Sequence, residues 1–143
     1  MRGNRLAEPV WALFRVVIGL LFALHGASTV FGVFGGNRGT GHAVPMGSWP
    51  GWYAGLIQLV CGLLVLVGLV TVPAAILASG SMAYAYFTVH QPHALLPLQN
   101  GGDAPVLFCW AFLAIAVVGP GRWSIDGLRR TGEQPPVYET VEA

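Results

Sequence analysis

Four histidines carry most of the chemistry that this chain of 143 residues could perform in ligand binding or proton transfer. His25 lies in a long apolar stretch, whereas His42, His90 and His93 lie in segments rich in glycine and proline. A neutral imidazole donates one hydrogen bond and accepts another, which suits a quinone carbonyl or a proton relay. An ionisable group inside an apolar span is a functional candidate by default. The competing interpretation of His25 is a structural hydrogen bond to a neighbouring helix beside Gly26.

His90 and His93 form a His-x-x-His pattern, and histidine is a common metal ligand. The same spacing is consistent with two solvated loop histidines, and no cysteine accompanies them. The two cysteines, Cys61 and Cys109, are too few for a four-thiolate zinc site and do not form a C-x-x-C motif. The sequence therefore predicts no bound metal, with His90 and His93 as the candidate ligands should a metal bind.

Five further polar or aromatic residues are expected near His25 because the segments that carry them begin or end on the same side of the molecule. We consider them candidates for contacting the polar groups of a small ligand. They are Gln58, Trp52, Tyr84, Asn100 and Asp103. The Gln58 amide has an equally good structural interpretation, in which it joins two helices by a hydrogen bond.

Arg15 is the single charge inside the first apolar stretch. It lies about one helical turn from the end of that stretch, so its aliphatic stem can be buried while its guanidinium stays near water. Asp126 follows the last apolar stretch on the same side. We predict an ion pair between Arg15 and Asp126 with a structural role, tying the C-terminal segment to the helices.

The hydrophobic and charged fractions of the chain indicate the environment that surrounds these side chains. The chain is 55% hydrophobic and only 9% charged, with a mean hydropathy of +0.64. Soluble domains contain about 25% charged residues, so a water-soluble globular domain is excluded, and so is a disordered chain. The net charge of +1 gives no basis for binding nucleic acid. The partner that the composition predicts is the lipid bilayer.

Four segments are apolar enough to cross a membrane, at about 20 residues for each crossing and fewer where the bilayer thins. They cover about residues 11–31, 51–70, 73–89 and 103–118. About three residues around Thr71 separate the second and third segments, which requires an antiparallel hairpin. Gly119-Pro120-Gly121 cannot continue a helix and ends the fourth segment. The sequence therefore predicts an all-α integral membrane four-helix bundle.

The expected organisation has three parts. Residues 1–10 form an N-terminal segment, residues 11–119 the transmembrane domain, and residues 120–143 a C-terminal tail. The transmembrane domain includes two long loops, residues 32–50 and 90–102. Loops of this length more often serve a function or cover a site than merely join helices.

Arginine counts predict the orientation, because positive residues flank membrane spans on the cytoplasmic side. One side carries Arg2, Arg5, Arg122, Arg129 and Arg130, and the other carries Arg38 alone. Both termini are therefore expected in the cytoplasm and both long loops outside. The competing interpretation treats residues 1–29 as a cleaved signal peptide, although their apolar run is longer than a typical signal core.

Several motifs, in order, resemble the DoxX family of small four-helix bacterial membrane proteins over about residues 8–128. The first helix contains Arg15, Gly19 and Phe22 followed by His25-Gly26, and the second reads Gln58-Leu-Val-Cys-Gly62. Asn100-Gly101-Gly102-Asp103 and Gly119-Pro120-Gly121-Arg-Trp-Ser124-Ile-Asp126 complete the resemblance. The family more often has a glutamate where Gln58 stands, and a lysine where Ser28 and Thr29 stand.

The resemblance implies a multi-pass protein of the bacterial plasma membrane. Relatives include the membrane subunit of a thiosulfate–quinone oxidoreductase and members associated with an oxidoreductase complex that contains superoxide dismutase and a sulfurtransferase. The function expected on this basis is a membrane subunit of a redox complex, with a quinone as its ligand and no redox cofactor bound in the chain itself. Protein partners in that complex are expected as well. The alternative is a non-enzymatic anchor or assembly partner for another protein.

Overall fold

The computed structural model describes residues 6–132, and within that range the chain is helical with no β-strand. The long helices are α1 (Ala7–Phe31), α2 (Gly51–Val67), α3 (Thr71–Ala85) and α5 (Asp103–Val118). Shorter elements are a 3₁₀ turn η1 (Asn37–Gly39), a π-helical turn η2 (Tyr86–His90), α4 (Pro97–Asn100) and α6 (Ile125–Gly132). Arg2, Arg5 and the tail beyond residue 132, which enter the predictions of orientation and organisation, lie outside the described residues.

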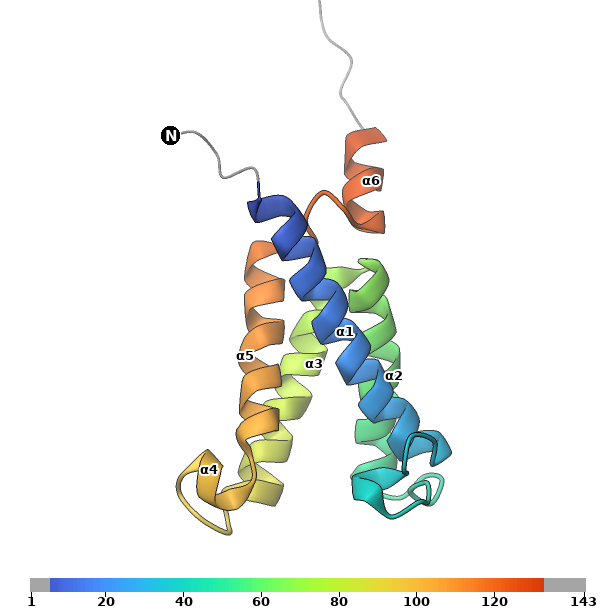
Figure 1. The fold of residues 1–143 in the computed structure, drawn as a ribbon, viewed down its shortest axis with the longest axis vertical. Helices are drawn as coiled ribbons and strands as arrows, with labels where there is room; N and C mark the ends of the chain where they lie inside the picture. Colours follow the sequence, from blue (N-terminus) through green and yellow to red (C-terminus); the bar gives the residue numbers. More distant parts are fainter. Residues whose placement is uncertain (1–5, 133–143) are drawn as a thin grey trace, which may run out of the picture.

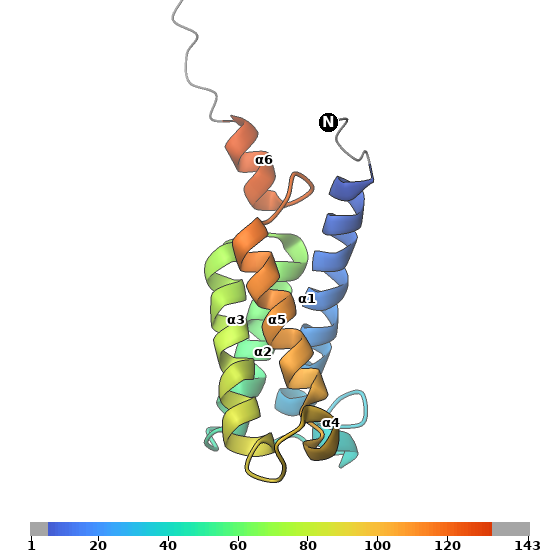
Figure 2. The same ribbon diagram turned by 90° about the vertical axis from the view of Figure 1, so that its left-hand side faces the viewer.

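Two helix pairs form the body of the molecule (Figures 1 and 2). α1 packs most extensively against α2, and α3 packs most extensively against α5. The turn between α2 and α3 joins the pairs at one end. At the other end, where η1 and α4 lie, the pairs diverge (Figure 1).

Glycines allow α1 and α2 to approach until their backbones touch. A Cβ atom added to Gly26 would lie 2.2 Å from the backbone nitrogen of Leu59, and one added to Gly62 would lie 2.5 Å from that of Ala23. Such small residues permit close helix packing where no side chain separates the two backbones. The α1–α2 pair is therefore closely packed, and it forms one wall of the space between the pairs.

The core lies where the two pairs still touch. Phe22 from α1 packs on Phe112 from α5, with ring centroids 4.6 Å apart, and Val65 and Ile115 are fully buried beside them. Facing residues on α3 are small, including Ala75 and Ala78. The large aromatic side chains of α1 and α5 fill the space left by the alanines of α3.

The α2–α3 turn is tight and partly strained. Gly68 ends α2 in the left-handed conformation, with φ of 72°, and its amide donates to the carbonyl of Leu64. Val70 also has a positive φ, 48°, which is unusual for a β-branched residue. Such a conformation persists only where surrounding contacts hold it, and these contacts come from Asp126, as described below.

Two helical segments, Ala7–Phe31 and Thr71–His90, are long and apolar enough to cross a membrane. Gly51–Val67 and Asp103–Val118 are apolar as well but shorter. The helices also differ from the predicted spans at their ends. α1 begins four residues before Trp11, α2 ends three residues before Val70, and α4 and α6 were not predicted.

Candidate functional site

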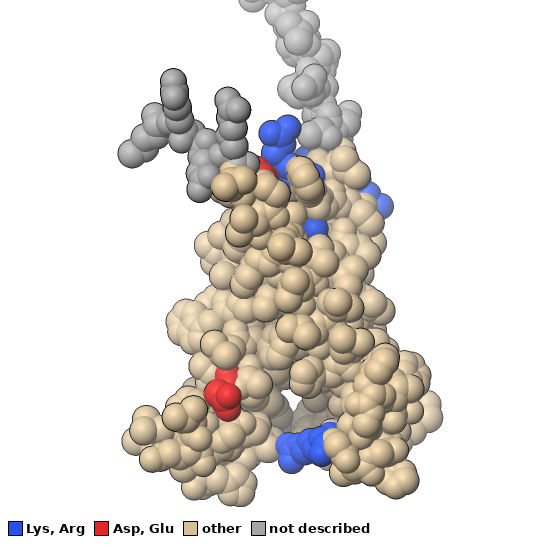
Figure 3. All heavy atoms as spheres, in the orientation of Figure 1, with Lys and Arg blue, Asp and Glu red and all other residues tan. Residues whose placement is uncertain are grey.

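A cavity of about 980 Å³ occupies the space between the diverging helix pairs. Its walls come from α1, α2 and η1 on one side and from α3, η2 and α5 on the other. The surface is hollowed there, with basic side-chain atoms, in blue, beside the opening (Figure 3). A volume between 300 and 1,000 Å³ and a mostly apolar lining are typical of sites for small organic ligands.

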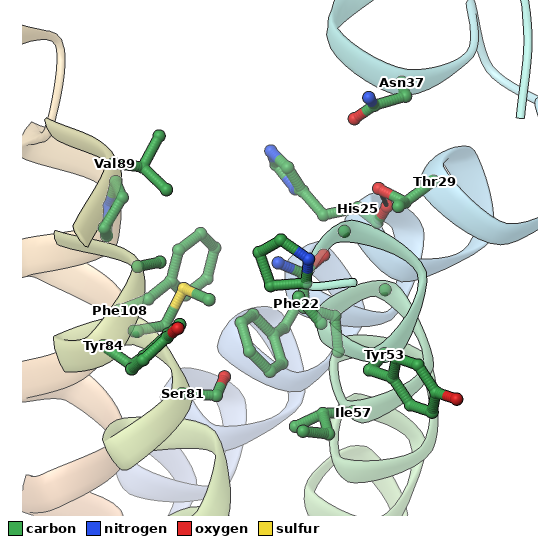
Figure 4. A pocket seen from close by; sticks show the side chains of 18 of the residues that line it. Phe22, His25, Thr29, Asn37, Tyr53, Ile57, Ser81, Tyr84, Val89 and Phe108 are labelled. Carbon is green, nitrogen blue, oxygen red and sulfur yellow. Dashed lines mark hydrogen bonds between the residues drawn. The ribbon is translucent and has the colours of Figure 1, made fainter. Parts of the chain in front are cut away.

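The floor of the cavity is apolar and aromatic. Phe22, Ile57, Met82 and Phe108 line it, and Phe22 and Phe108 are in contact, with ring centroids 5.3 Å apart. Figure 4 shows Phe22 and Ile57 on one side of the space and Phe108 on the other. Such a floor favours a planar or aliphatic apolar group over a small hydrated ion.

His25 projects from α1 into this space between Phe22 and the loop residue Asn37 (Figure 4). Its Nδ1 atom lies 2.9 Å from the carbonyl oxygen of Leu21, one turn earlier in the same helix. Because a carbonyl can only accept, we assign the hydrogen to Nδ1, which leaves the Nε2 lone pair available. The ring also packs edge-on against Phe108, at 5.8 Å between centroids. His25 therefore offers one oriented hydrogen-bond acceptor above an apolar floor.

Of the other five residues expected around a ligand, Gln58 and Tyr84 also line the cavity. The Gln58 amide makes no hydrogen bond to any other residue between 6 and 132, so the interhelical bond considered for it is not formed there. Tyr84 packs edge-on against Trp49 at the cavity wall. The structure thus brings His25, Gln58 and Tyr84 to one cavity.

Trp52, Asn100 and Asp103 do not line the cavity. Trp52 is half-buried and packs edge-on against Tyr53. Asn100 is used within its own loop, where its side chain donates to the carbonyl of Ala94 at 2.8 Å and accepts from the amide of Gly102 at 2.8 Å. Asp103 is exposed in the first turn of α5. Asn100 therefore shapes the loop before α5, and its side chain is not free to contact a ligand.

The two candidate metal ligands have different surroundings. His90 lines the cavity, and its Nδ1 atom lies 3.1 Å from the carbonyl oxygen of Asn100, whereas His93 is exposed. No group of three or more histidine, cysteine, aspartate or glutamate side chains that could hold a metal ion occurs in the described part of the chain. Cys61 and Cys109 are free thiols.

Arg38, in the turn η1, also lines the cavity, although it was not among the residues predicted to contact a ligand. A signal was present, since Arg38 is the one cation of the glycine-rich loop between the first two predicted spans. What could not be read from the sequence is that this loop folds back over the end of α1 and brings the guanidinium group to the cavity.

At the opposite end of the molecule, Arg15 is only 2% exposed and binds backbone carbonyls. Its guanidinium donates to the carbonyls of Val65 and Leu66, the latter at 2.7 Å, and to that of Trp123 at 2.8 Å. Val65 and Leu66 belong to the last turn of α2, where carbonyls lack the full set of helical partners and carry partial negative charge; that of Val65 also accepts from the amide of Gly68 at 3.2 Å. Arg15 therefore ties α1 to the end of α2 and to the segment before α6.

Asp126 binds the start of α3. Its carboxylate accepts hydrogen bonds from the amide of Val70 at 3.0 Å and from the amide and hydroxyl of Thr71 at 2.8 Å each. Burial alone would raise the pKa of Asp126, but these bonds and the charge of Arg129 outweigh it, so the pKa lies below that of an ordinary aspartate.

The predicted direct ion pair between Arg15 and Asp126 is absent from the contacts of both side chains within residues 6–132. Each side chain instead binds one side of the α2–α3 turn. Their opposite charges still attract each other across that turn. The reason for the difference is that free helix-end carbonyls and amides lie closer to each charged group than the other charged group does.

The sequence of this chain is similar to those of known proteins. The family model DoxX matches residues 10–91. A protein of Haemophilus influenzae, described as an uncharacterized protein, is 32% identical over 122 residues, which are 80% of this chain and 87% of that relative. The chain belongs to the DoxX family. No solved structure matches it.

The DoxX match covers α1 from residue 10 onward, α2, α3 and η2. It therefore includes four cavity residues: His25, Arg38, Gln58 and Tyr84. α5, which completes the cavity wall with Phe108, follows the matched range.

Proposed function

We propose that this DoxX protein crosses the bacterial plasma membrane four times, with both termini in the cytoplasm, and binds a quinone in the cavity as the membrane subunit of a redox complex. The observation that carries the proposal is the apolar cavity with the oriented Nε2 acceptor of His25 above its floor. A quinol hydroxyl donates to such an acceptor, and a protonated imidazole donates to a quinone carbonyl.

The cavity chemistry supports a ring-shaped apolar ligand with a few polar atoms. The aromatic side chains of Phe22 and Phe108 suit stacking against a planar ring. The amide of Gln58, which has no hydrogen-bond partner among residues 6–132, supplies a second polar contact, as a donor to a carbonyl or an acceptor from a hydroxyl. In this proposal the electrons are exchanged with a partner protein that carries its own redox cofactor.

The test compares quinone binding in nanodiscs for the unmodified protein and for His25→Phe and Gln58→Leu. Both substitutions keep roughly the volume of the side chain and remove its polar atoms. We expect the affinity for a short-tailed naphthoquinol, whose hydroxyls can donate to Nε2 of His25 and to the amide oxygen of Gln58, to fall about tenfold for each, because a hydrogen bond to the ligand is lost. His42→Phe is the matched control, since His42 is exposed and does not line the cavity.

A second measurement addresses the redox complex itself. Purification in mild detergent should recover quinone by mass spectrometry, together with a partner protein that contains a flavin, haem or iron–sulfur cofactor. Recovery of a partner without any redox cofactor, with unchanged quinone binding in His25→Phe, would support the anchoring role instead.

A further inference from the structure

Arg38 is the feature of the cavity that quinone binding does not require. It is the only lysine or arginine among the residues that line the cavity. No aspartate or glutamate lines the cavity, and Arg38 makes no ion pair within the part of the chain that the structure describes. Arg38 is exposed at the mouth of the cavity, and a cation without a counter-ion at the mouth of an apolar cavity favours an anion there.

The backbone holds Arg38 at this position at a conformational cost. Arg38 has φ of 52° and ψ of 32°, a left-handed conformation that glycine adopts more readily. A residue with a side chain in this region is a reason to look for a function of that side chain. In a loop where glycine is abundant, the position is nevertheless occupied by an arginine.

The loop that carries Arg38 is fastened to the end of α1. Ser28 donates to the carbonyl of Gly36 at 2.6 Å, and the amide of Val44 donates to the carbonyl of Thr29 at 2.8 Å. Inside the loop, the amide of Asn37 donates to the carbonyl of His42 at 2.9 Å. These bonds fix the backbone of η1 relative to His25, so the guanidinium is presented to the cavity from a defined base.

We propose that the preferred ligand is a planar apolar compound that carries one ionised oxygen group, such as an enolate or a carboxylate, and that Arg38 binds this group. The inference rests on the proposed function in that the ring occupies the same cavity. The ring lies against Phe22 and Phe108, a neutral oxygen faces His25, and the ionised oxygen faces Arg38. Arginine suits this task because its planar group donates two parallel hydrogen bonds and stays charged.

Two probes with nearly the same ring separate the contribution of the ligand's charge to the affinity from the contribution of its ring. 2-Hydroxy-1,4-naphthoquinone is a vinylogous acid and is ionised at neutral pH, whereas 2-methoxy-1,4-naphthoquinone is neutral. We expect the protein in nanodiscs to bind the ionised probe roughly five- to tenfold more tightly, as charge-assisted hydrogen bonds at a partly exposed site provide. The preference should fall as salt is added, because the opening is accessible to water.

Arg38→Gln should abolish the preference while leaving the affinity for the methoxy probe unchanged, and Arg38→Lys should retain part of it. All three residues experience the same backbone strain, so the comparison isolates the charge. Arg122→Gln, at the opposite end of the molecule and exposed, is the control for net charge. Thermal midpoints of the variants check that the fold is kept.

The possible outcomes test the role of Arg38 separately from quinone binding in the cavity. Equal binding of the two probes, or an equal loss of both in Arg38→Gln, overturns the role of Arg38 and leaves quinone binding intact. Binding of neither probe to the unmodified protein overturns both the role of Arg38 and the proposed function. Loss of the preference in Arg122→Gln would show that it arises from net charge, which also overturns the role of Arg38.

Discussion

Arg15 and Asp126 act on the two sides of one turn through backbone groups. Arg15 neutralises the carbonyls that end α2, and Asp126 binds the amides that begin α3. Each charge is opposite in sign to the partial charge of the helix end that it faces, so both interactions are favourable. Asp126 also holds Val70 in its left-handed conformation by binding its amide. The turn is therefore stabilised by two residues that come from opposite ends of the chain.

Arg15→Lys is expected to lower the free energy of unfolding by about 2 kcal/mol, because an ammonium group cannot reach the three carbonyls that the guanidinium binds. Thermal unfolding in detergent measures the effect. Arg122→Lys is the control, since Arg122 is exposed. Equal midpoints for Arg15→Lys and the unmodified protein would contradict the binding of the carbonyls described above.

Asp126→Asn is expected to cost about 1 kcal/mol at neutral pH, as the loss of a helix-capping carboxylate does. The pKa of Asp126 is lowered in the folded protein, so its contribution is fully present above the pKa of an unfolded aspartate, about 4. The contribution is lost as the pH falls through the lower folded pKa.

The unmodified protein and Asp126→Asn should therefore differ by a constant amount from pH 7 to about pH 5 and converge below about pH 4. Unfolding midpoints measured across this range provide the test. Asp103→Asn, which changes an exposed aspartate, should show no such convergence. A difference that persists unchanged at the lowest pH would mean that the carboxylate charge is not what stabilises the turn.

Residue types identified His25, Arg15 and Asp126 as side chains that need polar partners, but they did not identify all of those partners. A charge in an apolar helix requires a partner, and an opposite charge on the same side was the simplest one to infer from the sequence. The sequence does not reveal that free backbone carbonyls and amides are closer. Arg38 was overlooked as a site residue for a related reason, since its position depends on how a glycine-rich loop folds.

At the scale of elements, the close α1–α2 contact depends on glycines that face each other. Added Cβ atoms at Gly19, Gly26 and Gly62 would all lie within 3 Å of backbone atoms of the partner helix. Backbone atoms cannot move aside as a flexible side chain can, so the two helices would have to separate. Separation would also displace His25, which precedes Gly26 directly.

Gly26→Ala and Gly62→Ala are each expected to destabilise the protein by about 1–3 kcal/mol through overpacking. The matched control is Gly80→Ala in α3, where an added Cβ meets nothing within 4 Å. That control should be neutral or slightly stabilising, because alanine favours a helix over glycine. Equal midpoints for all three variants would exclude the backbone contact between α1 and α2.

Apolar segments predicted where the long helices lie, because about 20 apolar residues can be counted directly. They did not predict the helix ends or the short elements. α2 ends at the left-handed Gly68, and α6 begins where the Ser124 hydroxyl accepts from the amide of Gly127 at 2.9 Å. These boundaries depend on local hydrogen bonds, which cannot be inferred by counting apolar residues along the sequence.

For the whole molecule, the two ends of the helix bundle differ. We call the end with the α2–α3 turn the closed end, and the end where the helix pairs diverge the open end. The closed end contains the α2–α3 turn with Arg15 and Asp126, which keeps the two helix pairs together. The open end contains the cavity, because there the two pairs diverge and the loops connect helices of the same pair (Figure 1). A ligand entering at the open end thus meets Arg38 and His25 before the apolar floor.

We predict that the closed end faces the cytoplasm and the open end faces the outside. In the described residues Arg122, Arg129 and Arg130 lie at the closed end and Arg38 at the open end, so positive charge favours a cytoplasmic closed end. Single cysteines at positions 38 and 95, with Cys61 and Cys109 replaced by alanine, should react with a membrane-impermeant maleimide in intact spheroplasts. A cysteine at position 129 should react only after permeabilisation, and it serves as the control for membrane integrity. The opposite pattern would place the cavity opening in the cytoplasm, and its ligand would then have to come from that side.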